Sequence, residues 1–239
     1  MSPDPSFFTL HRDLPREGPG LAEDVHWALY AAATPEDARI ADLACGPGAD
    51  TRTLAKARPG ARIEAIDRVP HFVQEACARV VPYGARVTVR QGDMAEVTGP
   101  YDLIWCAGGI YFLGVTEGLR LWRGALAPEG RVAFSEPCLP PRPSEAARAF
   151  WAAEYPSVTG IEGIRDRVAA AGYRVLGERM VIGAAFGSYY EPMARRVADL
   201  RSGADAGLVA VLDAAEAEIA RWRAAPDDIA YALLVVAPE

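Results

Sequence analysis

The chain has 239 residues, of which 51% are hydrophobic and 24% are charged. This is the composition of a globular protein with enough apolar residues for a core, and it excludes a disordered, collagen-like or disulfide-stapled chain. The formal net charge is −7, from 25 Lys and Arg residues against 32 Asp and Glu residues. Because an acidic chain binds phosphate backbones poorly, we expect no nucleic-acid partner.

The cysteines and the hydropathy pattern indicate the compartment. The four cysteines have no CxxC or other metal-like spacing and lie in or beside apolar segments, which favours reduced thiols and no metal site. The start, MSPDPSFF, lacks the basic and apolar regions of a secretion signal. No apolar stretch approaches the roughly 20 residues that span a bilayer. We therefore expect a cytoplasmic protein without a membrane partner.

The first twenty residues are predicted to be irregular, because proline and glycine recur at Pro3, Pro5, Pro15, Gly18, Pro19 and Gly20. Residues 21–33 then have the apolar periodicity of a helix, which ends at Thr34-Pro35.

The middle of the chain alternates between strand and helix patterns. Such βαβα alternation predicts a parallel, doubly wound sheet with helices on both faces. The predicted strands are 38–44, 61–66, 86–90, 101–106 and 131–135, and the predicted helices are 50–57, 70–80 and 117–126.

The last hundred residues have a different pattern. A segment rich in glycine and aromatic residues, 183–190, and an apolar run that is typical of a strand, 229–237, are separated by helical patterns. We predict helices at 144–154, 161–171, 192–200 and 208–222, and a further strand at 173–182.

The most informative segment is 42–50, DLACGPGAD, which follows a predicted strand and opens a predicted helix. Glycines in such a loop let the backbone approach a ligand closely. Thr51 replaces the third glycine of the dinucleotide-binding pattern, and no Gly-Lys-Ser/Thr of a phosphate-binding loop is present. Asp42 would repel a pyrophosphate and instead suits a ligand that carries an ammonium group.

Two further aspartates follow predicted strands. Asp67 comes about twenty residues after the loop, where a carboxylate accepts hydrogen bonds from ribose hydroxyls. Asp93, in Gly92-Asp93-Met94, can accept from an adenine amino group, and the next backbone N–H can donate to the ring. The implied ligand is a ribonucleoside with an amino-acid tail and no phosphates, which is S-adenosylmethionine (SAM).

The motifs, in this order and spacing, resemble those of the class I SAM-dependent methyltransferases. D-x-x-C-G-P-G at 42–48, the strand-end aspartate, G-D-M and Y-D-L-I-W at 101–105 carry the resemblance over roughly residues 38–137. Further segments look like a narrower bacterial group of UbiE-like small-molecule methyltransferases. They are 14–20, 109–114, 135–137, 150–151 with 155–156, and 188–192. The resemblance implies an α/β, doubly wound, seven-stranded and mostly parallel sheet with an antiparallel last strand and a helical insert before it.

The same resemblance implies roles for cofactor-binding residues. Arg16 would lie near the methionine carboxylate. It belongs to the N-terminal segment at 15–20, the leader, which we expect to fold over the cofactor as a lid. Asp42 would orient the SAM amino group, and Asp67 would hold both ribose hydroxyls. The other implied cofactor-binding residues are Ala44, Cys45, Gly46, Gly48, Arg68, Asp93, Met94, Cys106 and Ala107.

Several of these roles have a plain structural alternative. The glycine loop and Asp93-Met94 could form ordinary turns, and Cys106 could be a small buried hydrophobic residue. Asp42 could brace the loop by a hydrogen bond, Arg68 could be a solvated side chain, and the leader could be exposed.

The acceptor-side candidates lie after strands, in the leader or in the last hundred residues. Tyr111 and Glu136 follow parallel strands at their carboxyl ends, where open α/β sheets place ligands. The catalytic candidates are Glu136, Tyr111 and His11, and the substrate-binding candidates are Tyr111, Trp151, Tyr189 and Tyr190. Core packing is the alternative for the aromatic residues, and helix capping is the alternative for Glu136.

We expect residues 1–239 to form one methyltransferase domain. Its parts are a lid and helix at 1–36, a SAM-binding core at 37–137, and acceptor-side helices with the C-terminal strands at 138–239. The expected function is methyl transfer from SAM to a small-molecule acceptor, leaving S-adenosylhomocysteine, by a monomer or homodimer. The alternatives are an NAD(P)-dependent oxidoreductase on a similar sheet and a SAM-binding protein that lacks catalysis.

Overall fold

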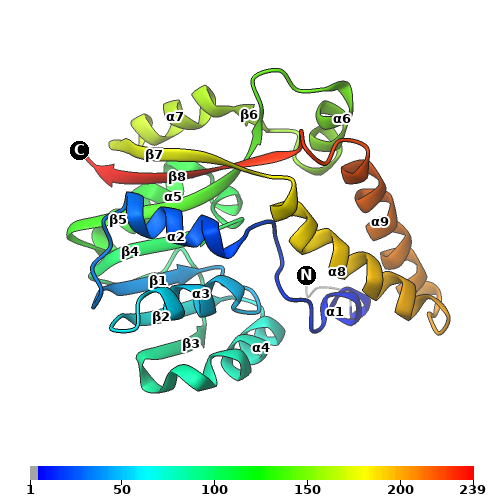
Figure 1. Ribbon diagram of the computed structural model, residues 1–239, viewed down its shortest axis with the longest axis horizontal. Coiled ribbons are helices and arrows are strands. Elements are labelled where there is room, and N and C mark those ends of the chain that lie inside the picture. The colour runs from blue at the N-terminus through cyan, green and yellow to red at the C-terminus, as the bar shows by residue number, and fades with distance from the viewer. Residues whose placement is uncertain (1–4) are drawn as a thin grey trace.

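The structure is built around one mixed sheet whose strands lie in the order β3-β2-β1-β4-β5-β8-β7, with the short β6 paired to β5 (Figure 1). The computed structural model describes residues 5–239, so the irregular structure expected for residues 1–4, Pro3 included, lies outside it. Strands β1 to β6 pair in parallel, whereas β8 is antiparallel to both β5 and β7. The strands are β1 (Arg39–Leu43), β2 (Arg62–Asp67), β3 (Val87–Gln91), β4 (Tyr101–Ala107), β5 (Leu126–Leu139), β6 (Thr159–Gly160), β7 (Tyr173–Ile182) and β8 (Ala230–Pro238).

Helices cover both faces of the sheet and extend past one side of it. None of the helices within residues 5–239 is both long and apolar enough to cross a bilayer. The helices are α1 (Pro5–His11), α2 (Ala22–Ala31), α3 (Ala49–Ala57), α4 (Pro70–Val80), α5 (Val115–Trp122), α6 (Glu145–Glu154), α7 (Ile161–Ala170), α8 (Ala184–Arg201) and α9 (Ala206–Arg223), with 3-10 segments at Val81–Arg86, Ile110–Phe112 and Arg123–Ala125.

The sheet separates two hydrophobic clusters because successive side chains of a strand point to opposite faces. Ala133 and Leu233 belong to the cluster that includes residues of α2, α3 and α8, whereas Phe134 and Leu234 belong to the cluster that includes residues of α5 and α7. Central strands that are covered on both faces consist of continuous apolar runs, as β8 does.

The expected fold class is confirmed, with β6 as a short addition to the seven strands. Two local predictions are wrong. Pro5–His11 is helical rather than irregular, and its Leu10 and His11 are buried. Helix α8 begins at Ala184 and continues through Pro192, although 183–190 was expected to lie outside a helix. In both places the packing of apolar side chains outweighs the low helix propensity of proline and glycine.

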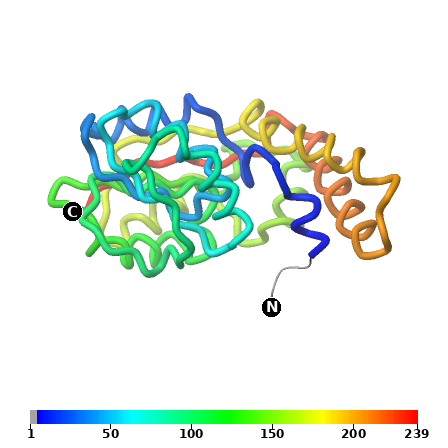
Figure 2. Tube along the Cα trace, turned by 90° about the horizontal axis from the view of Figure 1, so that it is seen from below, coloured from blue at the N-terminus to red at the C-terminus, as the bar shows by residue number. Residues whose placement is uncertain are grey.

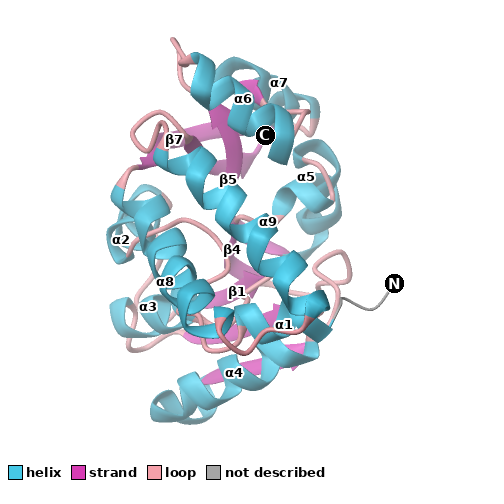
Figure 3. Ribbon diagram, turned by 90° about the vertical axis from the view of Figure 1, so that its right-hand side faces the viewer, coloured by secondary structure: helices cyan, strands magenta, loops and turns pink. Residues whose placement is uncertain are grey.

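Helices α8 and α9 form an antiparallel pair that extends beyond the sheet, and α1 packs against both of them (Figures 1, 2 and 3). Phe7 and His11 of α1 and Tyr189 of α8 face the same cavity as the carboxyl ends of the parallel strands. These helices therefore close the side of the sheet where α/β folds place ligands.

The core contribution of β8 can be measured at Leu234, which lies between β5 and β7 and is 0% exposed. We expect Leu234→Ala to lower the free energy of unfolding by about 2–5 kcal/mol, because it leaves a cavity in a packed sheet. Leu121→Ala, at a side chain that is 42% exposed, is the matched control and should change it by less than about 0.5 kcal/mol. If urea unfolding gave the same loss of unfolding free energy for Leu234→Ala and Leu121→Ala, this account of the core would be contradicted.

Candidate active site

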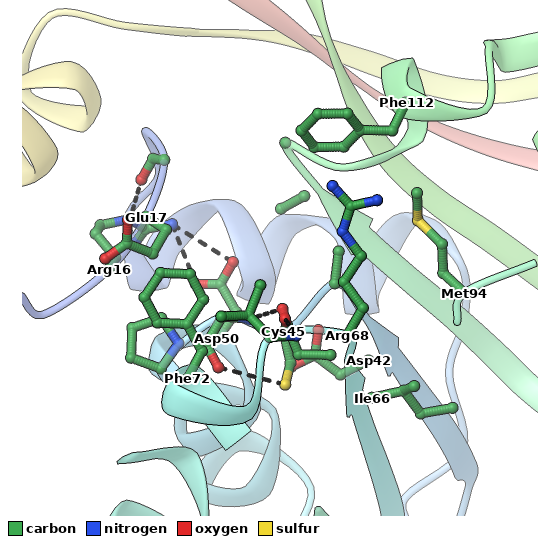
Figure 4. Close-up of a pocket in the computed structure, with 18 of the residues that line it drawn as sticks. Arg16, Glu17, Asp42, Cys45, Asp50, Ile66, Arg68, Phe72, Met94 and Phe112 are labelled. Carbon is green, nitrogen blue, oxygen red and sulfur yellow. Dashed lines mark hydrogen bonds and ion pairs between the residues drawn. The ribbon is translucent and has the colours of Figure 1, made fainter. Parts of the chain in front are cut away.

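A cavity of about 540 Å³, the main cavity, lies at the carboxyl ends of β1 to β4 (Figure 4). Asp42, Asp67 and Asp93 line it from the strands and the loops after them, and Arg16 and Glu17 line it from the leader between α1 and α2. Residues from distant parts of the sequence thus enclose one space.

The loop between β1 and α3 brings bare backbone to this cavity. Gly46 has a φ of 53° and lines the cavity, and a Cβ atom there would lie 3.6 Å from Cβ of Glu17. Gly48 has a φ of 86°, and a Cβ there would lie 3.2 Å from Cβ of Ala76 in α4. Gly46 therefore forms part of the cavity wall, whereas Gly48 permits the close packing of α3 on α4.

Asp67, at the end of β2, joins two backbone segments. Its Oδ2 accepts a hydrogen bond from the Gly46 N–H at 2.8 Å, and its Oδ1 accepts one from the Val69 N–H at 2.8 Å. Burial raises the pKa of this carboxyl, although both hydrogen bonds oppose the shift. Each carboxylate oxygen can accept a second hydrogen bond, so Asp67 can also receive hydroxyl groups from a ligand.

Asp42 is 2% exposed and accepts a hydrogen bond from the Thr51 hydroxyl at 2.5 Å. The loop-bracing contact is therefore present, and Asp42 also lines the main cavity. Burial is the largest cause that raises the pKa of Asp42 to about 8, and the neighbouring carboxylates Asp50 and Asp67 add to it. A cationic group in the cavity would favour the ionised form of this side chain.

Arg16 bridges the leader and the loop. Its guanidinium donates to the backbone oxygens of Gly18 and Gly20, and it lies 3.4 Å from Asp50 (Figure 4). Asp50 also accepts from the indole N–H of Trp105 at 3.3 Å. Asp50 was not predicted as a site residue, although its place in the first turn of α3 was a signal that could have identified it.

The leader is also tied to α4. Arg79 donates to the backbone oxygens of Leu14 at 2.8 Å and Pro15 at 3.1 Å, and also to that of Pro47 at 3.1 Å. One side chain therefore holds the leader against the glycine loop, so the segment covers the cavity instead of extending into solvent.

The far end of the main cavity is formed by aromatic, apolar and cationic groups. The guanidinium of Arg68 lies 5.6 Å from the ring centroid of Phe112, which is the geometry of a cation–π contact (Figure 4). Ile66 and Met94 line the same end (Figure 4), and Asp93, which precedes Met94 in the chain, also lines the cavity. This combination of an aromatic ring, a guanidinium group and apolar side chains suits a flat heterocycle.

A second cavity of about 180 Å³ adjoins the main cavity, and Glu17, Gly18, Tyr111 and Tyr189 line both. Aromatic side chains dominate the wall of the second cavity. They are Tyr111, Phe150, Trp151, Tyr155, Phe186, Tyr189, Tyr190 and Tyr231.

The predicted site residues fall into three groups. Lining the main cavity are His11, Arg16, Asp42, Ala44, Cys45, Gly46, Asp67, Arg68, Asp93, Met94, Ala107, Tyr111 and Tyr189. Lining the second cavity are Tyr111, Trp151, Tyr189 and Tyr190. Gly48, Cys106 and Glu136 line neither of these two cavities.

Strand alternation explains the positions of Cys106 and Glu136. Trp105 and Ala107 line the main cavity, so Cys106 between them points to the other face of the sheet and is fully buried. Pro137 lines the second cavity, so Glu136 beside it points to the other face of the strand. The Glu136 carboxylate lies 3.2 Å from the Arg167 guanidinium and 3.3 Å from the Tyr155 hydroxyl. Burial raises the pKa of Glu136 to about 7.

Glu17 stands where the two cavities meet and was missed as a site residue. Its Oε2 lies 2.6 Å from Nδ1 of His11, whose ring stacks on Phe7 with centroids 3.9 Å apart. Its Oε1 is buried without a hydrogen-bond partner among residues 5–239. Burial raises the pKa of Glu17, while His11 opposes the shift. The pattern Pro-Arg-Glu-Gly-Pro-Gly at 15–20 was the available signal.

The protonation of Asp42 should be visible in the pH dependence of stability. Because the folded pKa is raised from 3.8 to about 8, the folded state binds more protons between these values. The free energy of unfolding should therefore fall as pH rises through this range, by at most about 1.4 kcal/mol per pH unit. Asp42→Asn should remove this component, and urea unfolding between about pH 5 and pH 8 measures it.

Asp37→Asn, at an exposed carboxylate, should retain the wild-type slope. Parallel profiles for Asp42→Asn and the wild type would show that Asp42 does not change its protonation state in this range.

Comparisons with known proteins agree with this geometry. Residues 40–130 match the family model described as "Methyltransferase domain". Trans-aconitate 2-methyltransferase of Streptomyces avermitilis is 38% identical over 107 residues, which are 43% of this chain and 40% of that protein. The chain thus matches less than half of the length of this curated relative.

Two solved structures share the whole fold. The SAM-dependent methyltransferase of Geobacter sulfurreducens, in complex with S-adenosylhomocysteine, has a TM-score of 0.83 and 20% identity over 99% of this chain and 98% of its own. The SAM-dependent methyltransferase of Thiobacillus denitrificans, in the same kind of complex, has a TM-score of 0.83 and 18% identity over 100% of both chains. Residues 40–130 therefore match a methyltransferase domain, and the chain has the fold of these two SAM-dependent methyltransferases, in agreement with the resemblance of its motifs.

Proposed function

We propose that this protein is an enzyme that transfers the methyl group of SAM to a small-molecule acceptor. The observation that carries the proposal is the junction of the two cavities at Glu17, Gly18, Tyr111 and Tyr189. A donor in the main cavity and an acceptor in the second would meet there, under cover of the leader.

The residues of the main cavity fit SAM better than a phosphate-bearing cofactor. Asp42, Asp50 and Asp67 place three carboxylates around the loop where a dinucleotide would put its pyrophosphate. Arg16, the nearby cation, already contacts Asp50 and two backbone oxygens. This acidic surrounding opposes phosphates and favours a sulfonium and an ammonium group.

Each part of SAM has a matching group in the cavity. Asp67 would accept from the ribose hydroxyls, and Asp93 with the Met94 backbone would bind adenine beside Arg68. Asp42 would face the amino group, and Arg16 would face the carboxylate. When bound, SAM supplies a methyl group on a positively charged sulfur, which a nucleophile displaces in line.

The chain's own contribution is alignment and exclusion of water. Bringing nucleophile and methyl carbon to about 3–3.5 Å in a closed site supplies most of the acceleration in such a displacement. Tyr111 lies at the junction, and its ring centroid is 5.7 Å from that of Tyr155. Burial raises the pKa of Tyr111 to about 12, so its hydroxyl stays protonated near neutral pH and acts as a hydrogen-bond donor.

The size of the second cavity, about 180 Å³, supports a small acceptor rather than a nucleic acid. We also propose that the protein acts in the cytoplasm as a monomer or homodimer. The four free cysteines support a reducing compartment.

The donor assignment is tested at Asp67. We expect Asp67→Ala to weaken SAM binding about tenfold or more, because it removes hydrogen bonds to a charged group. Titration calorimetry gives the affinity, and circular dichroism checks that the variant is folded. Asp37→Ala, at an exposed residue, is the control and should bind SAM like the wild type.

Unchanged SAM affinity of folded Asp67→Ala would remove Asp67 from the donor site. Stabilisation of the wild type by NAD but not by SAM, in a thermal-shift titration, would instead favour the oxidoreductase alternative.

The junction is tested at Tyr111. Tyr111→Phe keeps the ring but removes the hydroxyl, so we expect SAM affinity to stay within about twofold while turnover falls about tenfold or more. Transfer of labelled methyl from SAM to metabolite extracts measures turnover and also tests the alternative of binding without catalysis. Equal turnover of both proteins would exclude the hydroxyl from the reaction.

A further inference from the structure

The second cavity has an unusual combination of groups on its wall. Three glutamates, Glu17, Glu154 and Glu218, line it together with a set of aromatic rings, and no Lys, Arg or His is among its lining residues. The glutamates come from the leader, the end of α6 and the middle of α9. The fold thus gathers carboxylates from three distant segments around one small space.

The three glutamates differ in the groups that contact their carboxylates. Glu154 pairs with Arg221, which lies outside the lining, and Glu17 contacts His11 at 2.6 Å. Glu218 accepts a hydrogen bond from the Tyr190 hydroxyl at 2.7 Å, and no ion pair in the described part of the chain involves it. Burial is the largest cause that raises the pKa of Glu218, and Glu154 adds to it, while the Tyr190 hydroxyl, Arg221 and His11 oppose the shift.

The wall also holds polar atoms without a partner. Trp151 is 3% exposed, and neither its Nε1 nor Oε1 of Glu17 has a hydrogen-bond partner among residues 5–239. Because Oε1 of Glu17 is an acceptor, a ligand that donates a hydrogen bond, as an ammonium group does, would satisfy it. The Nε1–H of Trp151 is a donor, so it requires an acceptor instead.

The aromatic rings of this wall contact one another in a connected series. Ring centroids lie 4.9 Å apart for Phe150 and Trp151, 5.7 Å for Trp151 and Tyr231, and 5.6 Å for Tyr231 and Phe186. Aromatic faces attract organic cations, so a wall rich in aromatic rings suits an ammonium group.

A metal ion does not explain these carboxylates. Within residues 5–239, no group of three or more His, Cys, Asp or Glu side chains is arranged to hold one. The cation that suits the cavity is therefore an extended organic one, whose apolar body contacts the rings while its charge faces a glutamate.

We infer that the acceptor is an amine that binds as its ammonium ion to Glu218 and Glu17 among the aromatic rings, and that polycarboxylates are excluded. One of these carboxylates would take a proton from the ammonium, so that the nitrogen lone pair could displace the methyl carbon from the sulfur of SAM and leave S-adenosylhomocysteine. This inference rests on the proposed methyl transfer and names the class of its substrate. It separates this chain from its relative named trans-aconitate 2-methyltransferase, since trans-aconitate carries three carboxylates. The family match at 40–130 contains only Tyr111 of the second cavity's lining residues, so it does not fix the acceptor.

The test compares phenylalkyl ligands of similar size that carry a positive charge, a negative charge or no charge. Phenethylamine, 3-phenylpropanoate and 3-phenylpropan-1-ol, together with trans-aconitate, are titrated by calorimetry into the protein saturated with S-adenosylhomocysteine. We expect phenethylamine to bind at least about tenfold more tightly than the acid or the alcohol, and trans-aconitate not to bind.

Variants then identify the carboxylate. Glu218→Gln keeps an acceptor for the Tyr190 hydroxyl but removes the charge, so amine affinity should fall about tenfold. Glu17→Gln should also weaken amine binding. Glu216→Gln, two residues away on α9 with a side chain that is 57% exposed, is the matched control and should bind the amine like the wild type.

The outcomes separate the two proposals. S-adenosylhomocysteine that fails to bind would refute the proposed function itself. If it binds, the inference is overturned by trans-aconitate, the acid or the alcohol binding as tightly as the amine, or by no amine binding at about 10 mM. Unchanged amine affinity in both folded glutamine variants, with melting temperatures near that of the wild type, would overturn it as well.

Discussion

The site depends on the pair of hydrogen bonds that Asp67 accepts from the backbone N–H groups of Gly46 and Val69. These bonds fix the turn after β1 against the end of β2, because a charged acceptor binds two donors of otherwise irregular backbone. Gly46 can occupy this position because its φ of 53° suits a residue without a side chain. One carboxylate thus shapes the loop and still presents free lone pairs to the cavity.

The leader adds the second half of the enclosure. Arg16 and Arg79 act as clamps, since their guanidinium groups bind backbone oxygens of the leader while reaching Asp50 and the glycine loop. The planar guanidinium offers five donors, so a single side chain can satisfy several carbonyls at once. A segment rich in proline and glycine thereby acquires a defined path across the cavity without regular secondary structure.

Local pattern predicted the parallel core well and the surrounding parts less well. The strands that carry Asp42, Asp67 and Asp93 are short apolar runs that end in turns, and their carboxyl ends meet by topology. Cys106 and Glu136 failed to line a cavity because a position one residue along a strand faces the opposite side of the sheet. The apolar pattern identifies the strand, but the packing of both faces of the sheet decides which of its residues face the cavity.

The acceptor side shows the other limit of sequence reasoning. Glu17 and Glu218 are 201 positions apart in the chain and become neighbours of one cavity only because α9 folds back against α1 and α8. Carboxylates that are buried near one another oppose folding unless protons or cations compensate them. Asp42, Glu17 and Glu218 all have raised pKa values, so this compensation is incomplete in the protein alone. The proposed cationic donor and cationic acceptor would each relieve part of that cost.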